Sequence, residues 1–461
     1  MRAASAEGPG VVLRSISASA AIFLTAAAFV VSKTGRDALY FQGDGLFDLP
    51  KAYIGIASLS LPMTLLLLAL MQRIGTRQAR VAIAAGMALA LVVIGRVARP
   101  GGGPLMTLIF MLIPLVFGLV FSSTWLLAAD LLEDAERKER ARAYSAIGAA
   151  SILGGALGAL LARTLSKHVE PQFFFGLGAL GLALAALIME TAHRFCPRRS
   201  ILRAGRLSAP TARDYRLLFE ERYARLLLII AMLASLAGLL IEFQFYLSAA
   251  TSGHGGRANA SFFATFYFTI NVAALAVQVL MIPRLQTWFG VYGCLFILPA
   301  TLFGGVAALL VSASGLGRSF LRVAEGSLKS SVHRVSWEQA YLPLSRTQRA
   351  VAKMIVDGLG SWLAEAAGAG IIAVWLHFMI RNHDLVGRST AWMGWMLLGV
   401  VLLWLALTRA LGRNLSHFSH AREMDAADRE DIPVPDRCVR AADLDLLPRE
   451  PHQQAVDRDS R

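Results

Sequence analysis

The chain has 461 residues, of which 56% are hydrophobic and only 16% are charged. A soluble protein would carry about a quarter charged residues, so the composition excludes an ordinary soluble enzyme or binding domain. The formal net charge of +14 would suit a nucleic-acid partner, but the sequence has no basic stripe with interleaved aromatic residues. We therefore expect no nucleic-acid binding and assign the excess of Arg and Lys to the loops of a membrane protein.

Apolar runs long enough to cross a bilayer, which takes about 20 helical residues, recur along the chain. The first run, Ala18–Val31 after Arg2 and Arg14, resembles a signal peptide. We expect it to stay uncleaved as the first span, because its removal would break the even number of spans. The predicted twelve transmembrane helices lie near residues 14–32, 51–71, 80–97, 104–128, 143–163, 173–193, 224–248, 260–283, 289–312, 317–341, 349–376 and 390–409.

The loops between the predicted spans differ in charge, and this difference sets the orientation. The loops on the side of the N-terminus collect basic residues, whereas the opposite loops hold scattered ones such as Arg99, Lys167 and Arg257. The positive-inside rule then places both termini in the cytoplasm, and we expect a multi-pass protein of a bacterial inner membrane. The basic inside residues are Arg73, Arg77, Arg80, Arg137, Lys138, Arg140, Arg142 and eight arginines between 194 and 222.

A polar central segment divides the predicted spans into two sets of six, with a weak likeness between Arg73–Arg80 and Pro283–Gly290 at matching places. Two related six-helix halves with a substrate between them are typical of major facilitator transporters. The C-terminal tail is rich in Asp, Glu, Arg and Pro without an apolar period, so we predict that it is disordered. The predicted organisation is a cytoplasmic N-terminus at 1–13, a half at 14–193, a cytoplasmic loop at 194–223, a half at 224–411 and a cytoplasmic tail at 412–461.

Ionisable residues in the tenth predicted span are the strongest functional signal. Arg318, Arg322, Glu325, Lys329 and His333 follow one another at four, three, four and four residues, which places them on one face of a helix. Such a helix either lines a cavity or lies on the membrane surface, and we favour the cavity because losing this span would reverse the charge pattern. The excess of cations predicts a positive surface that attracts phosphate or carboxylate. The alternative is an internal salt-bridge ladder with Glu325 that locks helices together.

Three carboxylates in other spans are candidates for coupling or charge pairing. Glu242 lies deep in the seventh span, where a lone carboxylate either pairs with a cation or carries a proton. Asp357 is one helical turn from Lys353 and is expected to pair with it. Glu365 lies deeper in the same span and is harder to explain as a structural group.

Two further groups of candidates stand at predicted span ends. Trp125 and Asp130 close the fourth span, where Trp125 either stacks on a ring of the substrate or belongs to the interfacial aromatic belt. Lys33, Arg36 and Asp37 follow the first span, where they form either a solvated helix end or part of a binding site.

Several segments resemble the ATP/ADP translocases, the nucleotide transporters of plastids and intracellular bacteria, which have bacterial relatives of unassigned substrate. The resemblance implies the major facilitator fold, nucleotide exchange through a basic cavity, and substrate-facing positions for Lys33, Arg36 and Lys329. The chain departs from the family pattern at Ala129-Asp130, where the carriers tend to have Asn and Glu, and at Gly358–Trp362, where they carry a basic Gly-Lys pair. We therefore retain the fold and the anionic substrate and give less weight to the nucleotide. The resembling segments are Lys33–Leu39, Leu49–Tyr53, Thr124–Asp130, Ala146–Gly158, Ser327–His333, Glu338–Leu344, Val351–Lys353 and Ile355–Asp357.

The sequence therefore predicts a monomeric secondary transporter, of exchanger type, that binds a small anionic molecule within the lipid bilayer. No P-loop, no helical metal-spaced His pair and only three scattered cysteines occur, so we expect no enzyme activity, metal or cofactor. A proton-coupled drug or metabolite exporter and a non-transporting membrane scaffold or sensor remain alternatives. The candidate substrate-binding residues are Lys33, Arg36, Arg318, Arg322, Lys329 and Trp125, and the candidate coupling or pairing residues are Asp37, Asp130, Glu242, Glu325, His333, Asp357 and Glu365.

Overall fold

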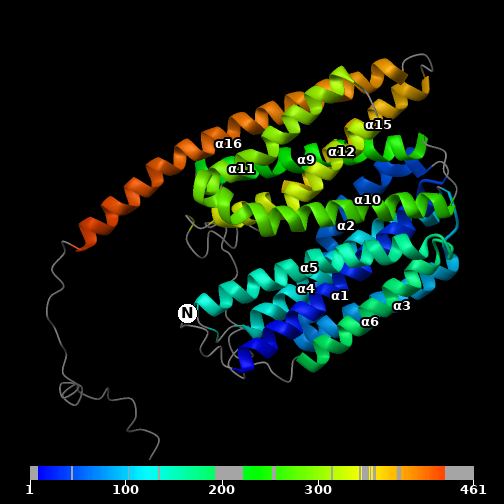
Figure 1. Cartoon of the computed structure of the whole chain (residues 1–461), viewed down its shortest axis with the longest axis horizontal. Helices are drawn as coiled ribbons and strands as arrows, with labels where there is room; N and C mark the ends of the chain where they lie inside the picture. The colour runs from blue at the N-terminus through cyan, green and yellow to red at the C-terminus, as the bar shows by residue number, and fades with distance from the viewer. Residues whose placement is uncertain are drawn as a thin grey trace, which may run out of the picture. The chain divides into compact units, whose positions relative to one another are not determined.

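The computed structural model is built of helices throughout the part of the chain that it describes (Figure 1). The described residues are 9–42, 45–101, 103–132, 135, 137–192, 222–251, 256–312, 315–341, 344, 352, 355–356, 360–381 and 386–430. The helices of the first half are α1 (Pro9–Tyr40), α2 (Gly45–Ile74), α3 (Thr76–Val97), α4 (Pro104–Leu131), α5 (Arg137–Leu165) and α6 (Phe173–Ala192).

The second half follows the predicted central loop, most of which lies outside the described residues. Its elements are α9 (Arg222–Thr251), α10 (Gly256–Ala276), η2 (Val277–Met281), α11 (Ile282–Val311), α12 (Gly315–Leu328), η3 (Lys329–His333), α13 (Arg334–Ala340), α15 (Ser361–Arg381) and α16 (Val386–Glu430). A π-helical turn, η2, lies between α10 and α11, and a second one, η3, lies between α12 and α13.

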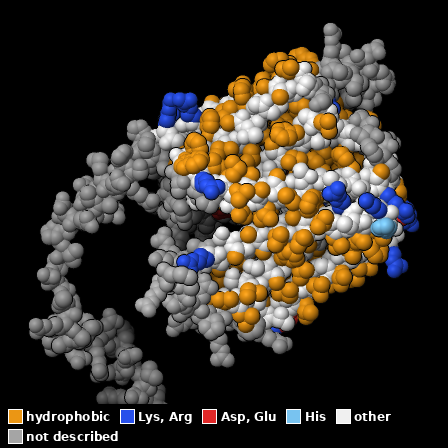
Figure 2. All heavy atoms as spheres, viewed as in Figure 1, with side chains coloured by type: hydrophobic (Ala, Val, Ile, Leu, Met, Phe, Trp, Pro, Cys, Tyr) orange, Lys and Arg blue, Asp and Glu red, His pale blue; other side chains and the backbone are white. Residues whose placement is uncertain are grey.

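The length and surface of these helices suit a lipid bilayer. Ten helices of the described chain are long and apolar enough to cross a membrane, and α2 and the α12–η3–α13 segment occupy the other two predicted spans. Leu66, Leu89 and Leu187 are among many large apolar side chains that point outward. Figure 2 shows hydrophobic side chains spread over the visible face, with Lys and Arg near the two ends. A water-exposed surface of this kind would be unfavourable, whereas lipid accommodates it.

The two halves meet along two lines of helix packing. α1 packs against α4, α5 and α6 within its own half and against α10 of the other half. α10 also runs along α5, and α15 packs against α2 (Figure 1). The cavity described below is lined by helices of both halves.

Close packing of α1 against α5 depends on glycines that the sequence supplies at Gly154 and Gly158. A Cβ atom on Gly158 would lie 2.6 Å from the Ala27 carbonyl oxygen, and one on Gly154 would overlap the Phe23 backbone. We expect Gly158→Ala to lower the free energy of unfolding by about 1 to 3 kcal/mol, because the backbone of α1 must move. Thermal unfolding of the purified protein measures this. Gly176→Ala, on α6 where a Cβ would meet nothing within 4 Å, is the control and should be close to neutral.

The C-terminal helix differs from its prediction. α16 continues to Glu430, whereas the sequence predicts a disordered tail from 412. The physical reason is local, since residues 413–432 contain neither Pro nor Gly and the next proline is Pro433. Residues 431–461 lie outside the described residues.

Candidate functional site

A cavity of about 200 Å³ lies between the two halves of the bundle. α1, α2 and α4 line it from the first half, and α9, α12, η3 and α15 line it from the second. Its apolar and neutral lining residues are Phe29, Tyr53, Ile56, Phe110, Pro114, Ser235, Gly238 and Leu239. Its charged lining residues are Lys33, Arg36, Glu242, Arg322, Lys329 and Glu365.

The basic residues of α1 lie inside the helix and not at a solvated end. α1 continues to Tyr40, so the alternative of a solvated helix end for Lys33, Arg36 and Asp37 is wrong. Arg36 is 3% exposed and its Nε donates to Oδ1 of Asp37 at 2.7 Å. Its Nη1 donates to the Phe110 carbonyl oxygen at 3.3 Å, and its guanidinium lies 3.9 Å from the centre of the Phe110 ring. These contacts anchor α1 to α4 with the charges held inward.

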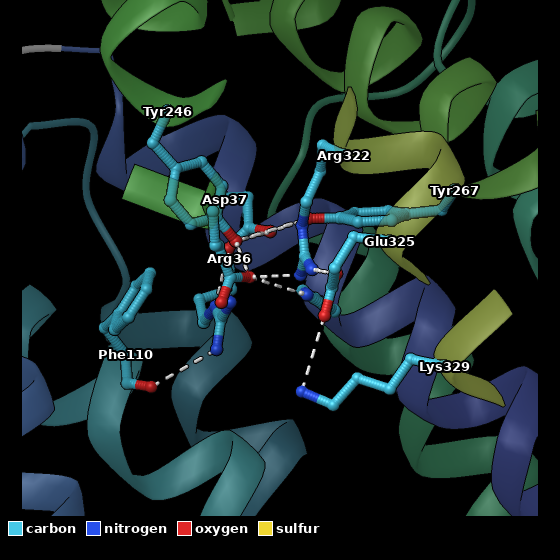
Figure 3. Close-up of polar contacts among 10 residues, drawn as sticks. Arg36, Asp37, Phe110, Tyr246, Tyr267, Arg322, Glu325 and Lys329 are labelled. Carbon is cyan, nitrogen blue, oxygen red and sulfur yellow. Dashed lines mark hydrogen bonds and ion pairs between the residues drawn. The ribbon is translucent and has the colours of Figure 1, made fainter. Parts of the chain in front are cut away.

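Asp37 connects the two halves through tyrosines. Its fully buried carboxylate accepts hydrogen bonds from the hydroxyls of Tyr246, at 3.2 Å, and of Tyr267, both in the second half (Figure 3). The Tyr246 hydroxyl also lies 3.1 Å from Glu242, but its single proton serves only one carboxylate at a time. The Phe41 and Tyr246 rings stack at 4.3 Å across the same seam. Asp37 is therefore a buried link between α1, α9 and α10.

Arg322 of α12 is the centre of the charged cluster. Its guanidinium lies 3.0 Å from Oε1 of Glu242. It also forms an ion pair with Glu325 (Figure 3). Lys33 approaches the same Glu242 oxygen at 3.5 Å and lies over the Tyr267 ring at 4.7 Å. Glu242 thus receives one cation from each half of the protein.

A second cavity, of about 450 Å³, is lined by the second half alone. Arg322 and Lys329 line both cavities, so the two share these side chains. The Lys329 side chain is 47% exposed and its Nζ lies 3.4 Å from Oε1 of Glu325. The remaining lining residues are Ala231, Ala234, Ser235, Glu325, Gly326, Ser330, His333, Arg334, Trp337 and Ser361.

Five ionisable residues of the tenth span were predicted to share one helix face. Four of them line this second cavity, namely Arg322, Glu325, Lys329 and His333. The η3 turn, which starts at Lys329, adds backbone length where an uninterrupted α-helix was assumed. His333 is buried between the rings of Trp337, at 5.6 Å, and Trp404, at 5.7 Å. Arg318 is half-buried one turn earlier and lines neither cavity.

Among the described residues, carboxylates pair with the cations of the predicted positive surface. Four cations, Lys33, Arg36, Arg322 and Lys329, occur together with four carboxylates, Asp37, Glu242, Glu325 and Glu365. The sequence pattern of one helix misses this balance because three of the carboxylates come from other helices. The balanced cluster includes the predicted ladder of Arg322 and Lys329 with Glu325.

Three other candidates lie apart from this cluster. Trp125 stacks on Tyr144 of α5, with ring centres 6.2 Å apart, and lines neither cavity. Asp130 accepts from Arg80 of α3 at 2.5 Å, which joins the ends of α3 and α4. Asp357 falls outside the described residues.

Several aromatic groups that line the first cavity or bond to the charged residues beside it were not predicted from the sequence. Tyr53, Tyr246, Tyr267 and Phe110 are aromatic residues within apolar spans, where an aromatic residue is usually part of the packing. One signal was available for Tyr246, since it follows Glu242 by four residues and so shares its helix face. Tyr267 has no such signal, because Asp37 is 230 residues away.

Comparison with known proteins supports this description. No protein-family model matches the chain. ADP,ATP carrier proteins 2 and 1 of Arabidopsis thaliana chloroplasts are 32% and 30% identical to it over 145 residues. That match covers 29% of this chain and 23% of each carrier, so it spans about a quarter of the relatives' length.

Solved transporter structures share the fold over nearly their whole length. The nucleoside transporter NupG superposes with a TM-score of 0.61 at 13% identity, covering 87% of this chain and 99% of NupG. A bacterial homologue of the human lysosomal transporter Spinster, solved inward-facing and unoccupied, superposes with a TM-score of 0.54 at 13% identity, covering 90% and 99%. The chain is thus an all-α polytopic membrane protein with the major facilitator fold, as predicted. The proteins that it resembles are transporters and not enzymes.

Proposed function

We propose that the protein is a secondary transporter that carries an anionic small molecule across a membrane by alternating access. The observation that carries the proposal is the position of Glu242, whose carboxylate lies between Lys33 of the first half and Arg322 of the second. A carboxylate in this place occupies the position that a substrate carboxylate or phosphate would need. An anion entering the cavity would replace Glu242 on these two cations.

The exchange of partners gives the site a simple mechanism. The guanidinium of Arg322 offers a planar fork that suits carboxylate and phosphate, and Lys33 adds a point charge from the opposite half. A substrate held by both would join the halves while Glu242 is released. Rocking of the halves about this site would then expose it to either side of the membrane in turn.

The names of the relatives are consistent with this substrate class. The chloroplastic carriers are named for ADP and ATP, both of which bear phosphates. We infer that the chain is a distant member of the same branch with a phosphate- or carboxylate-bearing substrate. We further propose a monomer in the bacterial inner membrane, with both termini in the cytoplasm on the basis of the loop charges.

A scaffold or sensor is the second candidate, and one observation favours it. The Arg36 and Arg322 guanidiniums are already paired with carboxylates, so a sealed network would lock the helices without binding anything. A drug exporter would instead need an apolar substrate cavity. Both alternatives predict that anions do not bind at Lys329, an exposed cation that lines both cavities.

Binding of anions to the purified protein tests the proposal. We expect one class among phosphorylated metabolites, nucleotides and organic acids to raise the melting temperature. Lys329→Ala should lower the affinity for that ligand about 10- to 100-fold, because Lys329 lines both cavities. This is the contribution of a charge-assisted hydrogen bond. Lys51→Ala is the control, since Lys51 is 76% exposed and pairs with Asp48 away from the cavity. Stabilisation by apolar drugs alone, or by no ligand, would contradict an anionic substrate.

A further inference from the structure

Glu365 is the one cavity carboxylate without a partner among the described residues. It projects from α15 into the cavity between the halves and is half-buried. The other three carboxylates of the cluster each have a cation nearby: Asp37 at 2.6 Å from Arg36, Glu242 at 3.0 Å from Arg322, and Glu325 at 3.4 Å from Lys329. Within the described residues, Glu365 has neither an ion pair nor a hydrogen bond.

Among the described residues, the surroundings of Glu365 do not supply a counter-charge. α15 packs between α9 and α2, so the side chain faces protein and cavity and not lipid. Lys329 and Glu242, which have opposite charges, line the same cavity as Glu365. Lys33, Arg36 and Arg322 line the same cavity but are engaged with other carboxylates. An ionised carboxylate within a membrane protein is costly unless a cation compensates it.

A second unpartnered oxygen lines the same cavity. The Tyr53 side chain on α2 is 7% exposed, and its hydroxyl has no hydrogen-bond partner in the described part of the chain. A buried hydroxyl without a partner is rare in proteins and points to an unseen ligand or water. Glu365 and Tyr53 both line this cavity, and oxygen atoms are the ligands that hard cations prefer.

We propose that Glu365 binds a monovalent cation from solution, a proton or an alkali metal ion, and that this cation accompanies the anionic substrate. The proposal rests on the transport function inferred above and names the coupling partner of the same site. Its physical basis is charge balance. The cluster has four cations and four carboxylates, so a substrate anion would leave it with excess negative charge that a cation on Glu365 would cancel.

Thermodynamic reciprocity then makes the two ligands cooperative. If the cation raises the affinity for the anion, the anion raises the affinity for the cation by the same factor. We expect a factor of about 5 to 150, the usual range of coupling between two sites. Transport of the anion would therefore follow the gradient of the cation.

The cation site can be tested without any substrate. The full-length protein is purified in detergent, and its melting temperature is measured in sodium, potassium or N-methylglucamine chloride at constant ionic strength and across pH. We expect the wild-type melting temperature to rise with sodium or potassium, or with falling pH, more than that of Glu365→Gln. A response to sodium or potassium identifies a metal ion, and a response to pH identifies a proton. If the melting temperatures of the wild type and of Glu365→Gln respond equally to the metal ions and to pH, the cation site is overturned.

The coupling is tested with the anion that stabilises the wild type most in the binding panel. The wild-type affinity for this anion should depend on the cation or on pH, whereas Glu365→Gln should keep the high affinity under all conditions. Glu190→Gln is the matched control, because Glu190 pairs with Arg77 at an exposed place outside both cavities. A Glu365→Gln protein that binds the anion with the wild-type dependence would overturn the coupling. Failure of every anion to bind the wild type would instead overturn the proposed function, while the cation test would still stand.

Discussion

Replacement of Asp37 by alanine is expected to lower the free energy of unfolding by about 3 to 5 kcal/mol, the cost of breaking a buried ion pair. The change would leave the guanidinium of Arg36, which is only 3% exposed, without its carboxylate. It would also remove the acceptor of the Tyr246 and Tyr267 hydroxyls, which join α9 and α10 to α1. Thermal or denaturant unfolding of the purified protein measures the loss.

A surface pair provides the control for this experiment. Arg257 and Glu170 form an ion pair at 2.9 Å with side chains that are 53% and 60% exposed. Glu170→Ala should therefore cost no more than about 1 kcal/mol. The double variant Arg36→Met with Asp37→Leu removes both charges and should recover much of the loss, because apolar residues often replace a buried pair without penalty. Asp37→Ala with no larger effect than Glu170→Ala would show that the buried link is not a stabilising one.

Arg322→Ala is expected to abolish measurable anion binding, with a loss of about 2 to 5 kcal/mol in binding free energy. Arg322 pairs with both Glu242 and Glu325, and it is the planar fork that the proposed substrate would occupy. Without it, Glu242 remains beside Lys33 at 3.5 Å, and Glu325 remains beside Lys329 at 3.4 Å. The cavity would then repel an anion. Arg322→Lys keeps one charge but loses the fork, so we expect partial binding.

Arg318→Ala is the matched control for this prediction and also separates two interpretations. Arg318 lies four residues earlier on α12 and lines neither cavity. The structure therefore predicts anion binding close to that of the wild type. The charge stripe taken from the sequence alone predicts a loss comparable to that of Arg322→Ala. Isothermal titration of the stabilising anion, or its concentration dependence in thermal unfolding, distinguishes the two outcomes.

Much of the fold follows from properties of single segments. A run of about 20 apolar residues is stable in a bilayer as a helix whatever it packs against. The predicted spans accordingly coincide with helices, and the polar central segment separates two sets of six. Helical spacing likewise brought Arg322, Glu325, Lys329 and His333 to one cavity, because residues three and four apart share a helix face. Helix ends were less predictable, since α1 continues to Tyr40 and α16 to Glu430.

The ion pairs and hydrogen bonds between charged residues and other helices were decided by the tertiary structure alone. Glu242 is 209 residues from Lys33, and Tyr267 is 230 residues from Asp37. Whether a cation in a span attracts a substrate or is neutralised by a carboxylate depends on which helices lie beside it. That choice results from packing over the whole bundle, including the close approach at Gly154 and Gly158. The sequence by itself thus determined a helical membrane protein with ionisable groups inside its spans. Only the tertiary structure decided which charges meet and that Glu365 lacks a partner among the described residues, because an ion pair depends on distances between helices that no local pattern encodes.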